Sequence, residues 1–163
     1  MPDDQVTIRL YTPTDLPRLQ SLTTEAFEPV SIDRNIETEF GVLNGRDWKW
    51  RKERAIADDC RRDPKGVFIA ELEGAIVGYI TTWIDRDGGM GMIPNLAVDR
   101  EVRGRGIGRQ LIEHALQHFR AEGLANARIE TLEQNPVGQK LYPSLGFREV
   151  ARQIHYGMRL DDK

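Results

Sequence analysis

A glycine-dense segment, RGRGIGRQ at residues 103–110, constrains this chain more than any other feature. Residues 95–98 shortly before it, which are mostly apolar, have the character of a strand. Apolar side chains then recur at helical spacing, and Gly123 is a natural stop, so a helix is predicted from residue 107. The apolar face of this helix consists of Ile107, Leu111, Ile112, Ala115, Leu116 and Phe119. The chain is therefore expected to run from a strand through a glycine loop directly into a helix.

A loop of this kind can hold phosphate groups by its backbone. The first turn of a helix has unpaired N–H groups and the positive end of the helix dipole. The glycines remove side chains that would keep an anion away from those amides, and the arginines add positive charge at the rim. We therefore predict a diphosphate-binding loop made of Arg103, Gly104, Arg105, Gly106, Ile107, Gly108 and Arg109.

Two well-known phosphate motifs do not match this loop. A P-loop needs Lys and then Ser or Thr after its last glycine, where this chain has Arg109 and Gln110. A dinucleotide fingerprint needs a glycine three residues after Gly106, and that position is again Arg109. However, Glu130 at the end of the next apolar run can imitate the ribose-binding acid of the dinucleotide fold. A nicotinamide-dependent oxidoreductase is therefore kept as an alternative.

A third pattern does match. Arg103-x-x-Gly106-x-Gly108 resembles the [QR]-x-x-G-x-[GA] acyl-CoA loop of the GNAT superfamily of N-acetyltransferases. Downstream, Asn135 suits a helix N-cap and Pro136 a first helical residue. The residues after them resemble the second signature of the superfamily in order and separation: Leu141-Tyr142 and Leu145-Gly146-Phe147.

The resemblance covers about residues 67–160 and implies both a fold and a cosubstrate. The fold is a mixed α/β sheet in three layers with splayed central strands, and the cosubstrate is acetyl-CoA. In such a fold the pantetheine arm lies in the splay. There it would be bound by Leu96, Ala97 and Val98, and by the side chain of Asn135.

The resemblance also implies chemistry for two residues. Tyr142 holds the position of the general acid that protonates the departing CoA thiolate, although Pro143 directly after it can shorten or kink the helix. Glu130 is the candidate general base, directly or through water. A carboxylate that works as a base near neutral pH needs burial to raise its pKa. The competing interpretation is that Glu130 forms a structural salt bridge.

The expected reaction is direct attack of a primary amine on the thioester in a ternary complex. The acceptor stays open among protein N-termini, lysines, polyamines, amino acids and aminoglycoside-like molecules. A non-catalytic acyl-CoA sensor would keep the same loop without turnover and is the second alternative.

The composition and the remaining sequence patterns constrain the partners, the compartment and the metal content of the protein. With 39% hydrophobic residues, 30% charged residues and a net charge of −3, the chain does not have the basic balance of a nucleic-acid partner. It shows no membrane-spanning apolar run and no signal-peptide pattern. The single cysteine, Cys60, fits a reducing compartment, so a cytoplasmic protein is expected. His114 and His118 are spaced as a helical metal pair without an apparent third ligand, so no metal is expected.

The remaining patterns predict one domain over residues 1–163. Thr14 is expected to cap the first helix, residues 28–45 are expected to be irregular, and Pro94 predicts a bulge because it cannot donate a ladder hydrogen bond. A homodimer through the last two strands is a further expectation from the resemblance. The predicted strands are 6–10, 67–72, 76–83, 92–98, 127–132, 149–151 and 154–160, and the predicted helices are 15–27, 47–62, 107–122 and 136–145.

Overall fold

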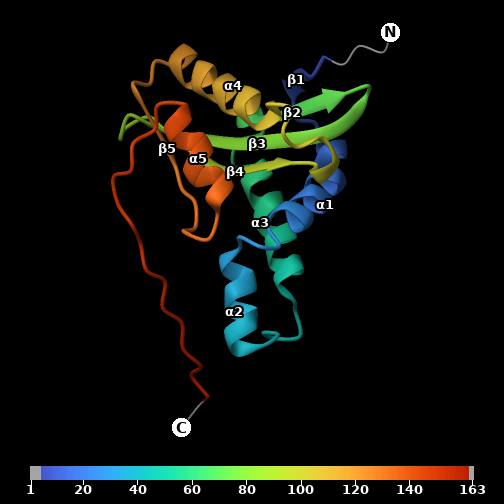
Figure 1. The fold of residues 1–163 in the computed structure, drawn as a ribbon, viewed down its shortest axis with the longest axis vertical. Helices are drawn as coiled ribbons and strands as arrows, with labels where there is room; N and C mark the ends of the chain where they lie inside the picture. The colour runs from blue at the N-terminus through green and yellow to red at the C-terminus, as the bar shows by residue number, and fades with distance from the viewer. Residues whose placement is uncertain (1–4, 162–163) are drawn as a thin grey trace.

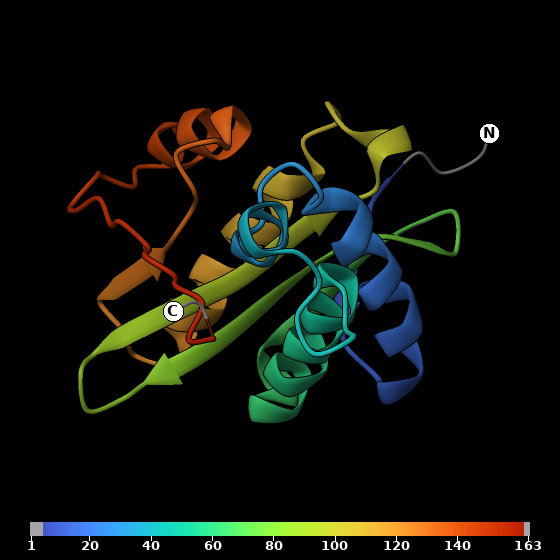
Figure 2. The same ribbon diagram turned by 90° about the horizontal axis from the view of Figure 1, so that it is seen from below.

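The computed structural model describes residues 5–161, which form one open five-stranded sheet with helices on both faces (Figures 1 and 2). The strands lie side by side in chain order, and only the last two are parallel. The strands are β1 (Thr7–Leu10), β2 (Val67–Leu72), β3 (Ala75–Asp85), β4 (Met90–Val98) and β5 (Asn126–Ile129). The helices are α1 (Leu16–Ala26), α2 (Ile32–Phe40), α3 (Trp48–Arg62), α4 (Ile107–Ala121) and α5 (Pro136–Ser144). This arrangement confirms the predicted mixed α/β sheet in three layers.

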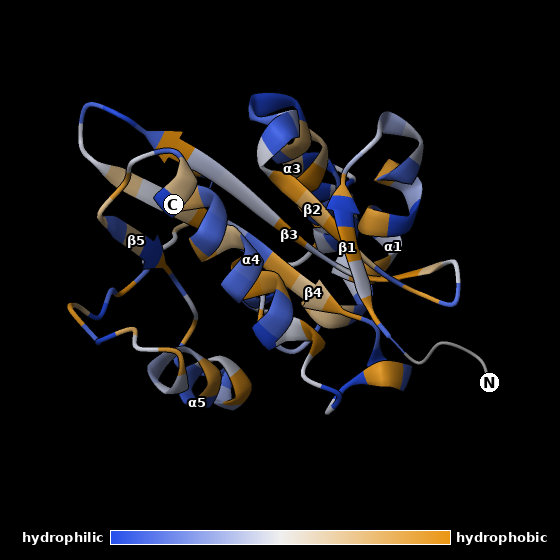
Figure 3. Cartoon of the chain, turned by 90° about the horizontal axis from the view of Figure 1, so that it is seen from above, coloured by the Kyte–Doolittle hydropathy of each residue, from blue (hydrophilic) through white to orange (hydrophobic). Residues whose placement is uncertain are grey.

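Each face of the sheet has its own core. On one face, α1 and α3 bury Leu19 and Ile56 completely against Tyr79 of β3. On the other face, α4 buries its predicted apolar stripe, including Leu111, against Phe68 and its neighbours. Figure 3 shows apolar residues along β2 and β4, between these helical layers. Burial of one such side chain stabilises the fold by about 1.5–3 kcal/mol, so the two cores hold the sheet rigid beneath the site.

Within residues 5–161, no helix combines the length and apolarity needed to cross a bilayer.

The segment predicted to be irregular, residues 28–45, contains the helix α2, and that prediction was wrong. Ser31 caps the helix by accepting a hydrogen bond from the backbone N–H of Arg34, at 3.4 Å. Gly41 ends it with a φ of +78°. The apolar residues of α2 recur at a four-residue spacing, which is a helical signal that the flanking Pro29 and glycines had obscured. Figure 1 shows α2 projecting away from the sheet.

The entry to the first helix also differs from the prediction. A short 3-10 turn, Pro13–Asp15, precedes α1, and Asp15 rather than Thr14 takes the N-cap position. Asp15 is buried, and Arg9 of β1 donates two hydrogen bonds to its carboxylate at 2.8 and 2.9 Å. This bidentate contact fixes the turn in place, because two parallel N–H···O bonds hold the carboxylate in one orientation.

The strand β4 contains the predicted bulge and parts from β5 there. Between the pairs Thr81–Asn95 and Trp83–Met92, β3 advances by two residues and β4 by three, so the extra residue falls beside Pro94. Pairing of β4 with β5 ends at Ile93 and Ile129. Residues 94–98 of β4 therefore have a neighbour on the β3 side alone, which is the splay expected between the central strands.

The two closing strands, predicted at residues 149–151 and 154–160, are absent, and this prediction was wrong. The tail from residue 148 runs extended past the helices (Figure 1), with Gly157 against the ring of Phe40. Its apolar side chains alternate as in a strand, yet a strand needs an edge to pair with. Because the tail leads away from β5, this alternating segment has no strand to pair with among residues 5–161.

The environment of His114 on α4 predicts that the fold is less stable in acid. His114 packs its ring on Phe68 at 4.5 Å, and burial, followed by the nearby His118, lowers its pKa below the usual value of about 6.5. The unfolded chain therefore binds this proton first as pH falls. The packing of neutral His114 therefore makes its full contribution to the free energy of unfolding above about pH 6.5, and this contribution declines as the pH falls below that value. Urea unfolding at about pH 7.5 and about pH 5.5 should show a lower free energy of unfolding at the acid value.

The variant His114→Gln is the control for this effect, because it keeps a polar side chain and removes the titration. The variant should lose less stability than the wild type between the same two pH values. Equal losses in the two proteins would show that His114 does not carry the acid sensitivity.

Candidate functional site

The free edge of β4 offers backbone groups at the splay. Asp99 donates its backbone N–H to the carbonyl of Val77, at 2.7 Å, so the backbone of Asp99 faces β3. Successive residues of a strand face opposite sides, so Ala97 also bonds toward β3 while Leu96 and Val98 direct their N–H and C=O groups into the splay. The carbonyl of Val98 accepts a hydrogen bond from Nε of Arg103, at 3.3 Å. Leu96 and Val98 thus present the backbone groups, whereas Ala97 buries its side chain on the opposite face of the sheet, in the core beneath α1 and α3.

The glycine loop lies at the end of this edge and begins α4. Gly104 and Gly106 have φ angles of +82° and +76°, in the left-handed region that other residues occupy at a cost. Gly106 is the N-cap of α4, so the amides of the first turn follow it directly. A Cβ on Gly108 would lie within 4 Å of side chains from both β4 and α5, which places the loop where these elements meet. Its positive helix end therefore faces the mouth of the splay.

The three arginines of the loop differ in their surroundings. Arg109 donates a hydrogen bond to Oγ of Ser144 on α5, at 2.7 Å, so it ties α4 to α5. Arg103 holds the end of β4 through its hydrogen bond to the carbonyl of Val98. Arg105 is exposed and has no hydrogen bond or ion pair to another described residue. Only Arg105 of the three is therefore wholly free to meet an anion, whereas the other two also brace the loop.

The helix α5 closes the far side of the splay. Asn135 caps it as predicted: its Oδ1 accepts a hydrogen bond from the N–H of Gly138 at 3.2 Å, and its Nδ2 donates one to Oγ1 of Thr131 at 2.8 Å. Gly138 is needed here because a Cβ would approach Nδ2 of Asn135 to 2.7 Å and the ring of Tyr142 to 3.0 Å. The cap, the glycine and the tyrosine are thus packed as one unit.

Tyr142 lies half-buried on α5 with its ring edge-on to Phe147, at 6.2 Å between centroids. Burial raises the pKa of its phenol above the usual value of about 10. Pro143 does not break the helix ahead of Tyr142, because α5 continues to Ser144 before it ends. The phenol therefore stays protonated at neutral pH and can act as a proton donor.

Glu130 does not have the burial that was expected of a base. It follows the last residue of β5 directly, its side chain is 65% exposed, and it forms an ion pair with Arg128. The predicted strand ran to residue 132, but β5 ends at Ile129, so Glu130 leaves the sheet and meets water. The competing interpretation, a surface salt bridge, describes its environment in the structure.

A clasp that the sequence did not indicate crosses the mouth of the splay. Gln134 donates a hydrogen bond to the carbonyl of Pro29 at 2.7 Å, and its amide oxygen accepts one from Asn35 of α2 at 2.9 Å. These contacts join the turn between α1 and α2 to the loop before α5. No signal in the sequence pairs residues about a hundred positions apart, so only the fold could show this.

A buried polar network supports the bulge from below. Asn95, next to Pro94, donates hydrogen bonds to Asp59 of α3 at 2.7 Å and to Thr81 of β3 at 2.9 Å.

The two histidines of α4, His114 and His118, face Phe68. No group of three or more metal-binding side chains gathers anywhere in residues 5–161.

Comparison with known proteins bears on the same elements. Residues 22–147 match the acetyltransferase (GNAT) family, which is most of the chain. Mycothiol acetyltransferase of Thermobispora bispora is 32% identical over 162 residues, covering 90% of this chain and 54% of that protein. The chain thus spans about half the length of the curated relatives it matches.

Solved structures share the fold. An aminoglycoside N-acetyltransferase in complex with a bisubstrate analogue of CoA has a TM-score of 0.66 and 22% identity, over 95% of this chain and 99% of that one. A PaiA N-acetyltransferase from Thermoplasma acidophilum in complex with coenzyme A has a TM-score of 0.70 and 19% identity, over 88% and 90%. Together with the family match, the splayed strands and the glycine loop assign the chain: it belongs to the acetyltransferase (GNAT) family.

Proposed function

We propose that this protein transfers the acetyl group of acetyl-CoA to a primary amine in a ternary complex. The observation that carries the proposal is the splay of β4 from β5. It places the backbone of Leu96 and Val98 beside the glycine-lined N-terminus of α4. A pantetheine arm carries amides that can pair with a strand edge, and a diphosphate suits a helix N-terminus. An acyl-CoA has both groups, because its pantetheine arm carries the amides and is joined at one end to the diphosphate.

The proposal assigns parts to the centre of the loop and to the strand edge beside it. The backbone amides from Gly104 to Gly108 bind the diphosphate, with Arg105 as the free cation at the rim. Leu96 and Val98 bind the pantetheine and polarise the acetyl carbonyl, which stabilises the oxyanion as the amine attacks. Asn135, whose side chain caps α5, lies at the start of that helix, and its side chain binds the same pantetheine arm.

The chemistry that follows is a balanced exchange. The amine nitrogen forms a bond to the acetyl carbon, the C–S bond breaks, and its electron pair leaves with sulfur. An ammonium substrate gives up two protons: the thiolate gains one from Tyr142, which is then reprotonated, and solvent receives the other. Glu130 is exposed, so its part is to relay the second proton through water. Holding both substrates in line supplies much of the rate, about 7–11 kcal/mol of the barrier in well-oriented reactions.

The names of the related proteins suggest where to look for the acceptor. They include a mycothiol acetyltransferase and an aminoglycoside N-acetyltransferase, so aminoglycosides belong in a first panel of amines. We assign the reaction to the cytoplasm, in keeping with Cys60, a single cysteine whose thiol is free and buried.

The proposed assembly is a homodimer in which the tail of each copy pairs with β5 of the other. Val150, Ile154, Tyr156 and Leu160 are 74–92% exposed, and β5 is the last strand of the sheet. Large apolar side chains exposed in a row mark an interaction surface. Sedimentation should give a dimer for the wild type and a monomer for the double variant Ile154→Lys, Tyr156→Lys. A monomeric wild type at assay concentration would overturn the proposed dimer.

Calorimetric titration tests the cosubstrate assignment. The wild-type protein should bind acetyl-CoA and CoA and give no heat with NAD. Binding of NAD without binding of acetyl-CoA would overturn the proposal and favour the oxidoreductase alternative.

A further inference from the structure

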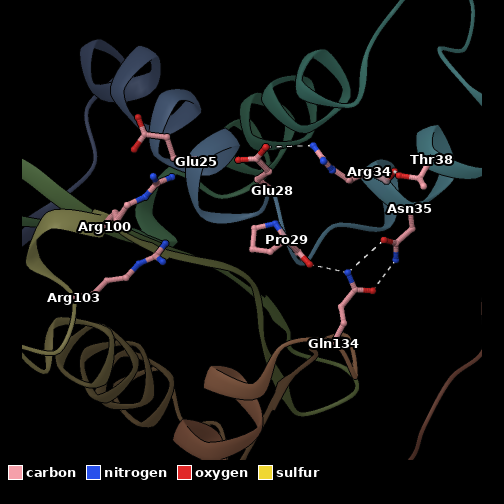
Figure 4. A pocket seen from close by; sticks show the side chains of 9 residues that line it. All are labelled: Glu25, Glu28, Pro29, Arg34, Asn35, Thr38, Arg100, Arg103 and Gln134. Carbon is pink, nitrogen blue, oxygen red and sulfur yellow. Dashed lines mark hydrogen bonds and ion pairs between the residues drawn. The ribbon is translucent and has the colours of Figure 1, made fainter.

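A pocket of about 520 Å³ opens at the mouth of the splay (Figure 4). Two segments far apart in the sequence form its walls: the end of α1 with α2 on one side, and the segment after β4 on the other. Charged side chains of both signs line it: Glu25, Glu28, Arg34, Arg100 and Arg103. The pocket can therefore meet a ligand that carries both a positive and a negative group.

The two sides of the pocket differ in how their charges are satisfied. On the α2 side, Arg34 pairs with Glu28 at 3.4 Å. On the opposite side, neither Arg100 nor Arg103 has a carboxylate partner among the described residues. Arg103 uses its Nε on the carbonyl of Val98, which leaves its terminal nitrogens available. Figure 4 shows both guanidinium groups directed into the pocket. An anion bound between them would complete their hydrogen bonds.

The carboxylates are also placed to serve a ligand. The carboxylate of Glu25 has no hydrogen bond or ion pair to another described residue. Glu28 accepts a single contact, from Arg34, through one of its two oxygens. Ionised carboxylates attract an ammonium group and raise its local concentration.

The pocket spans the mouth of the splay, from the end of β4 beside the glycine loop to the start of α5. Arg103 is bonded to the carbonyl of Val98, at the end of the splayed edge. Gln134, which also lines the pocket, directly precedes Asn135 at the start of α5. A ligand in the pocket therefore has access to the gap between β4 and α5, which is the route by which an amine must approach the thioester.

We propose that this pocket binds the acceptor, and that the acceptor is an amine that also carries an acid group, a carboxylate or a phosphate. This inference rests on the proposed function. Arg100 and Arg103 hold the acid group, and Glu25 and Glu28 draw in the ammonium end. Acetylation converts the ammonium into a neutral amide, so the product loses its attraction to the glutamates and leaves.

The test compares matched amines that differ in the acid group alone. One pair is phosphoethanolamine and ethanolamine, and the other pairs are free amino acids and their amides, so the two arms separate phosphate from carboxylate. The rate measured is amine-dependent release of CoA thiol at saturating acetyl-CoA. The acid-bearing member of at least one pair should have a kcat/KM about tenfold or more above that of its neutral partner, as a charge-assisted contact gives.

The variant Arg100→Gln should remove that preference while the KM for acetyl-CoA changes by less than about twofold, because Arg100 lies outside the backbone loop. Arg120→Gln, an equal charge change at an exposed position near the far end of α4, is the matched control and should change neither value. A rise in the KM for acetyl-CoA alone would assign Arg100 to the cosubstrate and overturn the inference.

Two further outcomes separate this inference from the proposed function. Turnover of neutral amines in preference to acid-bearing ones would overturn the inference and leave the acetyltransferase proposal standing. Absence of turnover with every amine, including lysine, polyamines and aminoglycosides, would overturn both.

Discussion

The variant Gly106→Asp is expected to bind acetyl-CoA at least about a hundredfold more weakly than the wild type. Gly106 is the N-cap of α4 in the proposed diphosphate loop, with a φ of +76°. A carboxylate there would lie beside the phosphates. Two unit charges about 4 Å apart repel by about 4 kcal/mol at an effective dielectric constant of about 20, and each 1.4 kcal/mol is a factor of about ten. Calorimetric titration with acetyl-CoA measures the loss.

The matched control for this variant is Gly106→Asn. Asparagine and aspartate both tolerate the left-handed conformation better than other side chains and both cap helices, so the fold is kept in either case. The uncharged variant should weaken binding much less than Gly106→Asp. Similar losses in the two variants would mean that the bulk of a side chain, rather than its charge, weakens binding at this position.

Replacing Tyr142 by phenylalanine is expected to lower kcat by about 10²–10⁴-fold, the range for loss of a general acid. Phenylalanine fills the same space beside Phe147, so the KM for acetyl-CoA should change little. Burial raises the pKa of the phenol above its usual value, so the wild type should not lose activity through this group at any pH below about 10. Steady-state kinetics across this pH range check both statements.

Glu130→Gln provides the contrast for this experiment. Glu130 is exposed and paired with Arg128, so a relay through water should contribute less than about tenfold to kcat, below the range of a direct acid or base. A larger loss in Glu130→Gln than in Tyr142→Phe would contradict the assignment of the two roles.

The elements around the loop could be predicted because their signals are local. The apolar stripe of α4 follows from side chains three and four residues apart, and the cap of α5 follows from Asn135 and Pro136 standing together. The bulge of β4 follows from Pro94, a residue that no central ladder accommodates without one.

Other features depend on contacts that the local sequence does not encode. The tail alternates as a strand would, but pairing requires an edge, and its course leads away from β5. Glu130 is exposed because β5 ends at Ile129, directly before it. The pocket joins α2 to the segment after β4, and the helix α2 itself was missed, so its lining could not be assembled from sequence patterns.

The measurement that tests the central claim most directly is acetyl transfer itself. The protein is incubated with acetyl-CoA and each amine of the panel, and both products are followed: CoA thiol by its colour reaction and the acetylated amine by mass spectrometry. We predict that at least one amine yields the two products in equal amounts, and that Tyr142→Phe suppresses both together. Binding of acetyl-CoA without any amine-dependent product would contradict the account and identify a non-catalytic acyl-CoA sensor.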